Sequence, residues 1–201
     1  MRLIMGLNLR RISFTDWAES AVWESYLDEF YKEIEESVGN KLPYNEWTAE
    51  DNEFPRVGSY TAYGIFWYFL CFIHKGDFEK ELEKDDDIEK IALQAFREDL
   101  NSGSVHLPFA DHFLEINDTN TIFLPVFFEK PIKIYGTDIA SLPGAMKTLE
   151  ALSEAISFDL SSEYEKEYIN DRWMPIATAK NVAKTIYNFF GENPKSCVSF
   201  S

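Results

Sequence analysis

The sequence predicts a mainly helical α+β protein that folds as a single compact domain over residues 1–201. Residues 63–73 (YGIFWYFLCFI) form an unbroken apolar run that suits a central buried helix, and several other segments repeat apolar residues at helical spacing. Between residues 105 and 135, prolines divide the chain into the short apolar runs typical of strands. A chain of this size buries about 70% of its unfolded surface. We therefore expect one hydrophobic core that needs neither disulfides nor a metal.

The central helix is expected over residues 59–74. Ser59 is placed to cap the amide of Ala62, and Gly76 follows as a stop signal. The apolar run would rise roughly 16 Å, which is about half of a hydrocarbon core, so we expect a buried helix and no membrane span. His74, at its C-terminal end, is expected to interact as a cation with the helix dipole.

The N-terminal half is expected to contain one strand and at least two further helices. Residues 3–14 alternate loosely and indicate a short strand, with a helix entering from Thr15 as the alternative. Residues 15–38 predict one long amphipathic helix, and residues 42–57 predict a loop that Trp47 and Phe54 pin to the core. Residues 77–99 indicate one broken helix or two short ones. The apolar residues expected to face inward there are Phe78, Leu82, Ile88, Ile91, Ala92, Ala95, Phe96 and Leu100.

The C-terminal half is expected to begin with short strands or extended loop over residues 105–135. The turn residues 118–121 favour a hairpin there. A helix follows from Ser141 to Phe158, and the polar residues 159–172 form either a surface helix or an ordered loop. A final helix over residues 175–190 precedes a short strand, residues 196–201, which pairs with the extended region or with the N-terminal strand.

The charge of the chain restricts its partners. With 35 acidic and 19 basic residues, the net charge is -16, which disfavours sequence-independent binding to nucleic acid or to an anionic membrane. A protein partner should therefore be basic. Cys71 lies in the apolar run and Cys197 near the end of the chain, so both are expected to be reduced thiols. The first residues lack a signal-peptide core, and we expect a cytoplasmic protein with no membrane anchor.

No familiar catalytic motif occurs in the sequence, and we expect no catalytic residue, cofactor or metal. The nearest approach to a metal site is His106, Asp111 and His112, whose spacing matches no helical ligand pair. We favour a histidine satisfied by hydrogen bonds over a ligand. The alternative function is an enzyme or small-ligand-binding protein with a pocket at these three residues.

Acidic side chains gather on segments expected to be helical. The candidate partner-binding residues are Glu29, Glu33, Glu35 and Glu36, with a second patch at Asp85, Asp86 and Asp87. Asp85–87 lacks the spacing of an EF-hand and suits the first turn of a helix. The chain also has 17 Phe, 10 Tyr and 5 Trp residues, more aromatic area than one core easily hides. Some of it is expected on a docking surface or in a homodimer interface, so a monomer and a homodimer both remain open.

The chain resembles the bacterial immunity proteins that neutralise secreted toxin domains. The resemblance lies in its acidic, aromatic-rich composition and in its ending, an alanine-rich helix (IATAKNVAKTIYNFF) followed by Val198, Ser199, Phe200 and Ser201. It implies a chain that binds a basic toxin or effector domain and blocks its active site, without catalysis of its own. No contact residue is implied, because these families diverge fastest at their binding faces.

Overall fold

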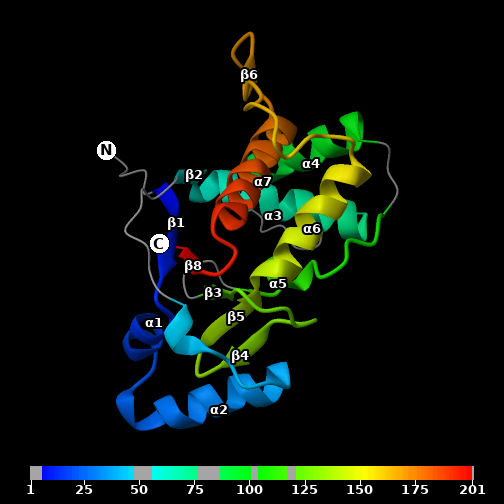
Figure 1. The fold of residues 1–201 in the computed structure, drawn as a ribbon. Helices are drawn as coiled ribbons and strands as arrows, with labels where there is room; N and C mark the ends of the chain where they lie inside the picture. Colours follow the sequence, from blue (N-terminus) through cyan, green and yellow to red (C-terminus); the bar gives the residue numbers. More distant parts are fainter. Residues whose placement is uncertain (1–5, 48–55, 77–86, 101–103, 117–120, 201) are drawn as a thin grey trace.

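A mixed six-stranded sheet runs through the molecule, with helices on both of its faces (Figure 1). The computed structural model describes residues 6–47, 56–76, 87–100, 104–116 and 121–200. Within them, the sheet has the order β2-β1-β8-β3-β5-β4. Its strands are β1 (Gly6–Ile12), β2 (Arg56–Ser59), β3 (Thr121–Leu124), β4 (Ile132–Ile134), β5 (Thr137–Ser141) and β8 (Cys197–Phe200). The helices are α1 (Phe14–Ala21), α2 (Leu27–Val38), α3 (Tyr60–Lys75), α4 (Asp87–Asp99), α5 (Asp111–Leu114), α6 (Leu142–Ala155) and α7 (Pro175–Glu192), and two single 3-10 turns are η1 (Glu24–Tyr26) and η2 (Tyr44–Glu46). The predicted fold class, α+β and mainly α in one compact domain, is confirmed.

The C-terminal strand β8 joins the two halves of the sheet. It lies between β1 and β3 and is antiparallel to both, with Phe200 opposite Leu9 and Val198 opposite Phe123. The two predicted alternatives, pairing with the N-terminal strand and pairing with the extended region, therefore both occur. β3 is parallel to β5, and β4 closes one edge as the antiparallel neighbour of β5.

Alternating side chains of the sheet build two separate cores. Phe123, Ala140 and Val198 face a large core shared with α3, α4, α6 and α7. Their neighbours Ile122 and Cys197 face the other way, into a smaller core with α1, α2 and Trp47. The period of two along each strand thus produces a three-layer arrangement, with the sheet in the middle. Cys71 and Cys197 are both buried thiols that are not joined in a disulfide, as expected.

The central helix α3 forms as predicted. The hydroxyl of Ser59 accepts a hydrogen bond from the amide of Ala62 at 3.1 Å. Gly76 ends the helix with a φ of 84°, a left-handed conformation that glycine adopts without steric cost. Eight of its side chains are buried, and it packs most extensively against α7.

The prediction of one long helix over residues 15–38 is wrong, because this segment forms three separate elements, α1, η1 and α2. Ser13 caps α1, and its hydroxyl accepts from the amide of Asp16 at 3.4 Å. At the break, Val22 and Trp23 are extended. This conformation buries Val22 in the smaller core and turns Trp23 outward to solvent. The second half of the predicted helix, α2, ends at Gly39 as expected.

Three further expectations are corrected. The two strands of the hairpin predicted around residues 118–121 are not paired: residues 111–114 form α5, and β3 pairs with β5 and β8, while residues 118–120 lie outside the described part of the chain. In this part of the chain, a hairpin joins β4 to β5 instead. The loop expected over residues 42–57 ends in strand β2. Ile88 and Ile91, expected to face inward, are exposed on α4, while Ala92 and Phe96 are buried.

The segment between α6 and α7 is an ordered loop, one of its two predicted forms. It ends in a small hairpin of β6 (Tyr168–Ile169) and β7 (Arg172–Trp173) that projects from the body beside α7 (Figure 1). Ser141 caps α6 by accepting from the amide of Gly144 at 3.0 Å, as predicted. The predictions made for Leu3, Met5, Phe54, Phe78, Leu82, Asp85 and Asp86 lie outside the described residues.

Candidate functional site

Exposed aromatic rings lie near an exposed and a half-buried carboxylate at one end of the molecule, on η1, α2 and the turn between β4 and β5. We call this the α2 surface and define it by Trp23, Tyr26, Glu29, Glu33 and Tyr135. Trp23 precedes η1, Tyr26 ends it, and Glu29 and Glu33 lie one helical turn apart on α2. Figure 1 shows α2 at the end of the molecule opposite the β6–β7 hairpin. The α2 surface is therefore built from segments more than a hundred residues apart in the sequence.

Trp23 is the most exposed large apolar side chain of the described residues, at 81%. Burying a large apolar side chain stabilises a protein by roughly 1.5 to 3 kcal/mol, and the exposed Trp23 does not contribute this stabilisation. Its exposure follows from the break between α1 and η1, since the extended backbone there turns it away from the core. Exposed tryptophan is enriched in the contact regions that dominate protein binding energy.

Tyr135 lies on the α2 surface in a left-handed backbone conformation that is unfavourable for a residue with a Cβ. It has a φ of 51° and is followed by Gly136 at 78°, which makes the two-residue turn that twists with the strands. Asparagine or glycine usually takes the first of these positions, because a side chain with a Cβ costs about 1 kcal/mol there. The Tyr135 ring lies 5.6 Å from the ring of Tyr26 and 6.4 Å from that of Phe30.

Glu29 and Glu33 give this aromatic group a negative field. Partial desolvation raises the pKa of Tyr135 to about 12, together with a hydrogen bond to Glu29 and the charges of Glu29 and Glu33. The Tyr135 hydroxyl therefore stays protonated and donates to the Glu29 carboxylate. Among the described residues, the ion pair of α2 is Lys32 with Glu36 at 3.5 Å, and neither Glu29 nor Glu33 contacts a lysine or arginine. These two carboxylates are available to a cation from outside the chain.

The other residues predicted to bind a partner are arranged differently. Glu36 is exposed and paired with Lys32, whereas Glu35 is half-buried and accepts from the amide of Leu42 at 3.1 Å, which holds the chain after α2. Asp87 is the first residue of α4, as its predicted first-turn role requires. Carboxylates are also exposed on α4, α6 and the 159–172 loop, so charge alone does not single out α2. Exposed rings occur on the 159–172 loop too, at Tyr164 and Tyr168, and what distinguishes the α2 surface is Trp23, at 81% exposure.

Sequence reasoning found Glu29 and Glu33 but missed the aromatic half of the α2 surface. Trp23 does not fit the helical spacing of the other apolar residues in 15–38. This misfit is the sequence signal that its ring lies outside the core. Tyr135 could have been suspected from its place before Gly136 in a turn between two apolar runs.

No family model matches this chain, and no curated protein or solved structure is significantly similar to it. The candidate site therefore depends on its geometry alone.

The predicted histidine cluster is not assembled into one site. His112 is buried on α5, where its Nε2 donates to the carbonyl of Phe128 at 3.0 Å and its Nδ1 accepts from the amide of Ser141 at 3.2 Å. Both ring nitrogens are satisfied, as favoured from the sequence. His106 is exposed and lies 5.3 Å from the ring of His74. Within the described part of the chain, no group of three His, Cys, Asp or Glu side chains could hold a metal.

His74 does not have the cationic role expected of it. Its Nδ1 accepts from the amide of Leu107 at 3.0 Å, which requires an unprotonated nitrogen. Burial lowers the pKa of His74, helped by the neighbouring His106 and Lys75 and opposed by Asp111. His74 therefore holds the segment after α4 against the end of α3 as a neutral ring.

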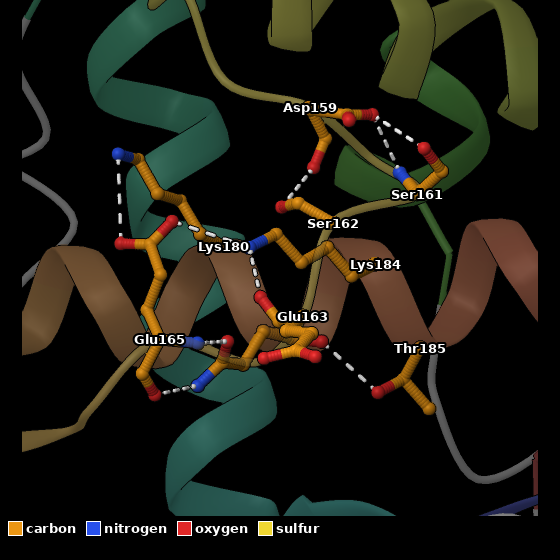
Figure 2. Close-up of polar contacts among 9 residues, drawn as sticks. Asp159, Ser161, Ser162, Glu163, Glu165, Lys180, Lys184 and Thr185 are labelled. Carbon is orange, nitrogen blue, oxygen red and sulfur yellow. Dashed lines mark hydrogen bonds and ion pairs between the residues drawn. The ribbon is translucent and has the colours of Figure 1, made fainter.

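A second polar cluster, shown in Figure 2, ties the loop between α6 and α7 to α7. Lys184 is only 1% exposed, and its Nζ donates to the carbonyl of Glu163 at 3.0 Å and to the carboxylate of Glu165 at 3.2 Å. Asn181 accepts from the amide of Glu165 and donates to its carbonyl. Because these donors and acceptors are occupied by the chain itself, the cluster fixes the loop to α7.

In the described ranges, no helix has the length and apolar character needed to cross a membrane.

Proposed function

We propose that this protein is an immunity-type inhibitor that binds a basic toxin or effector domain through the α2 surface. The observation that carries the proposal is a pair of exposed rings, Tyr26 and Tyr135, that lie 5.6 Å apart beside the charges of Glu29 and Glu33. Trp23, which is 81% exposed, precedes Tyr26 by three residues in the chain. Exposed rings can supply anchors that desolvate on contact, and free carboxylates can pair with lysine or arginine on the partner. The protein acts in the bacterial cytoplasm and blocks its partner without catalysis.

The electrostatics support this assignment. A net charge of -16 attracts a basic partner from a distance and raises the association rate. At short range, Glu29 and Glu33 compete with phosphate for the cationic groups that a nuclease or other cationic effector uses to hold its substrate. The interaction should therefore weaken as salt screens it.

The resemblance of the sequence to bacterial immunity proteins agrees with this function. The enzyme alternative has less support, because His112 has both ring nitrogens occupied and His106 lies on the exterior. The cavities beside Tyr44, beside Tyr187 and between α4 and α7 are all lined by other residues.

The test begins with the product of the gene immediately upstream, mixed with the purified chain. We expect a complex whose dissociation constant rises about a hundredfold or more in the variant Trp23→Ala with Glu29→Lys and Glu33→Lys, since central anchors each contribute roughly 2 kcal/mol or more. Isothermal titration calorimetry measures the affinity. The matched control carries Glu115→Lys and Glu154→Lys, which make the same change of charge at exposed positions elsewhere.

The function requires more than binding. Cells that express the upstream protein should stop growing, and co-expression of the wild-type chain, but not of the α2-surface variant, should restore growth. A pull-down from the source organism extends the search if the upstream product does not bind. Equal loss of affinity in both variants would contradict the α2 surface, and the absence of any co-purifying basic protein would contradict the inhibitor function.

A further inference from the structure

A groove of about 530 Å³ lies at the other end of the molecule, between α4, the β6–β7 hairpin and the start of α7. One wall consists of Ala95, Glu98 and Asp99 on α4. The opposite wall is formed by the hairpin and the first turn of α7, and its residues are Ile169, Asn170, Arg172, Trp173, Met174, Pro175 and Ile176. The walls are therefore largely apolar, with carboxylates on one side.

The apolar character continues along α4 beyond the groove. Ile88 and Ile91 precede Ala95 by seven and four residues, so helical geometry places them on the same face. Ile91 is 55% exposed, and Ile169 across the groove is 54% exposed. Isolated exposed apolar residues need no explanation, but a row of them that runs into a groove is typical of a site for another chain.

The charges of the groove select a cationic occupant. Glu98 and Asp99 lie in the last turn of α4, where the helix dipole is already negative and acidic side chains are unfavourable. Glu98 accepts from the side-chain Nε2 of Gln94 at 2.8 Å, and neither carboxylate forms an ion pair with a described residue. A lysine or arginine at this end of the groove would relieve that repulsion. A second copy of this chain, with its net charge of -16, is a poor occupant.

The groove is held open by the structure before any partner arrives. Lys184 fixes the loop that leads into the hairpin through its contacts to Glu163 and Glu165 (Figure 2). Asn181 adds a hydrogen bond from the amide of Glu165. At the hairpin itself, the indole nitrogen of Trp173 donates to the Thr178 hydroxyl at 3.1 Å, which ties β7 to α7. A preformed groove avoids part of the entropic cost of binding.

We infer that this groove is a docking site for a protein segment in which an apolar side chain is flanked by lysine or arginine. The apolar side chain enters between Trp173 and Ala95, and the cation meets Glu98 and Asp99. Arg172 on the opposite wall repels a cation there and so fixes the direction in which the segment lies. The site is separate from the α2 surface and does not depend on the inhibitor function.

The test uses the full chain labelled with 15N and the acetylated, amidated peptide LKKLLKKLLKKL. We expect backbone resonances of Ala95, Ile169 and Trp173 to shift on titration. The peptide GKKGGKKGGKKG carries the same charge without apolar side chains and measures attraction to the acidic surface alone, and LEELLEELLEEL tests the requirement for cations. Two variants test the position: Ala95→Arg fills the groove, and Glu98→Lys with Asp99→Lys reverses its charge. Glu115→Lys with Glu129→Lys is the control of equal charge at exposed sites elsewhere.

The inference is supported if the leucine–lysine peptide shifts the groove resonances and both groove variants weaken its binding at least about tenfold more than the control does, a difference of about 1.4 kcal/mol. It is overturned if the glycine–lysine or leucine–glutamate peptide shifts the same resonances equally. It is also overturned if the shifts lie only on the α2 surface or if no groove resonance moves. Each outcome can be read from the 15N spectrum whether or not the proposed toxin partner exists.

Discussion

At the scale of single residues, His112 connects three parts of the chain. It belongs to α5, donates to the carbonyl of Phe128 after β3, and accepts from Ser141 at the start of α6. No other tautomer satisfies both contacts, since Nδ1 must be free of a proton. Burial lowers the pKa of His112, against the opposing influence of the Phe128 carbonyl and the Asp111 charge.

Stability should consequently fall as pH falls below about 6.5, the usual pKa of histidine. Above that pH, the ring is neutral in both the folded and unfolded states, so the full stability is present. Below that pH, His112 is protonated in the unfolded chain but stays neutral in the folded chain. Stability is therefore lost as the pH falls from about 6.5 to the lowered pKa of folded His112. The slope is at most about 1.4 kcal/mol per pH unit for each such histidine, and His74 adds to it. Urea unfolding between neutral pH and pH about 5 measures the effect.

The variants His112→Gln and His106→Gln separate this contribution from other titrations. His112→Gln should lower stability at neutral pH and flatten the profile below about pH 6.5, because the group that titrates is gone. His106→Gln leaves both hydrogen bonds of His112 in place, so its profile should stay steeper than that of His112→Gln. A profile that stays equally steep without His112 would show that another group is responsible.

At the scale of elements, α6 approaches α5 so closely that only glycine fits at position 144. A Cβ built on Gly144 would lie 2.6 Å from Cδ2 and 2.7 Å from Nε2 of His112. The buried ring cannot move without losing its two hydrogen bonds. The early glycine of α6, unfavourable for a helix, is therefore required by the packing of one helix on another.

Gly144→Ala should destabilise the fold by about 1 to 3 kcal/mol, the usual cost of overpacking a core. The matched control is Gly64→Ala in the middle of α3, where a Cβ meets nothing within 4 Å. There the loss of glycine's backbone entropy should stabilise the helix by roughly 0.5 to 1 kcal/mol. Urea unfolding of both variants should give shifts of opposite sign, and two shifts of the same sign would contradict the account of Gly144.

The sequence predicted well those elements whose signals are local. The apolar run and Ser59 identified α3, Ser141 identified the start of α6, and the stop residues after position 190 nearly bounded α7. What it could not predict depends on contacts distant in the chain. The break after Ala21 reflects the burial of Val22 against the sheet, and the exposure of Ile91 reflects which side of α4 meets α7. Likewise, Glu29 and Glu33 were found from charge, but Tyr135 joins them only because β4 packs beside α2.

At the scale of the whole molecule, the net charge of -16 has opposite effects on folding and on binding. Carboxylates are exposed on α2, α4, α6 and the 159–172 loop, and ion pairs such as Lys32 with Glu36 at 3.5 Å neutralise few of them among the described residues. The folded chain brings these charges closer together than the unfolded chain does. Their mutual repulsion therefore favours unfolding at low ionic strength.

Added sodium chloride should stabilise the folded chain while it weakens the proposed complex. Raising ionic strength from about 0.01 M to about 0.15 M shortens the Debye length from about 30 Å to about 8 Å, which screens repulsion within the chain and attraction to a basic partner alike. The urea midpoint should rise over this range while the dissociation constant increases. A variant with Glu115→Gln, Glu129→Gln and Glu154→Gln, all exposed and outside the α2 surface, should show a smaller rise because it repels itself less. A midpoint that stays constant or falls with salt would mean that the carboxylates are already compensated within the fold, and the long-range steering argued for the α2 surface would then lose its source.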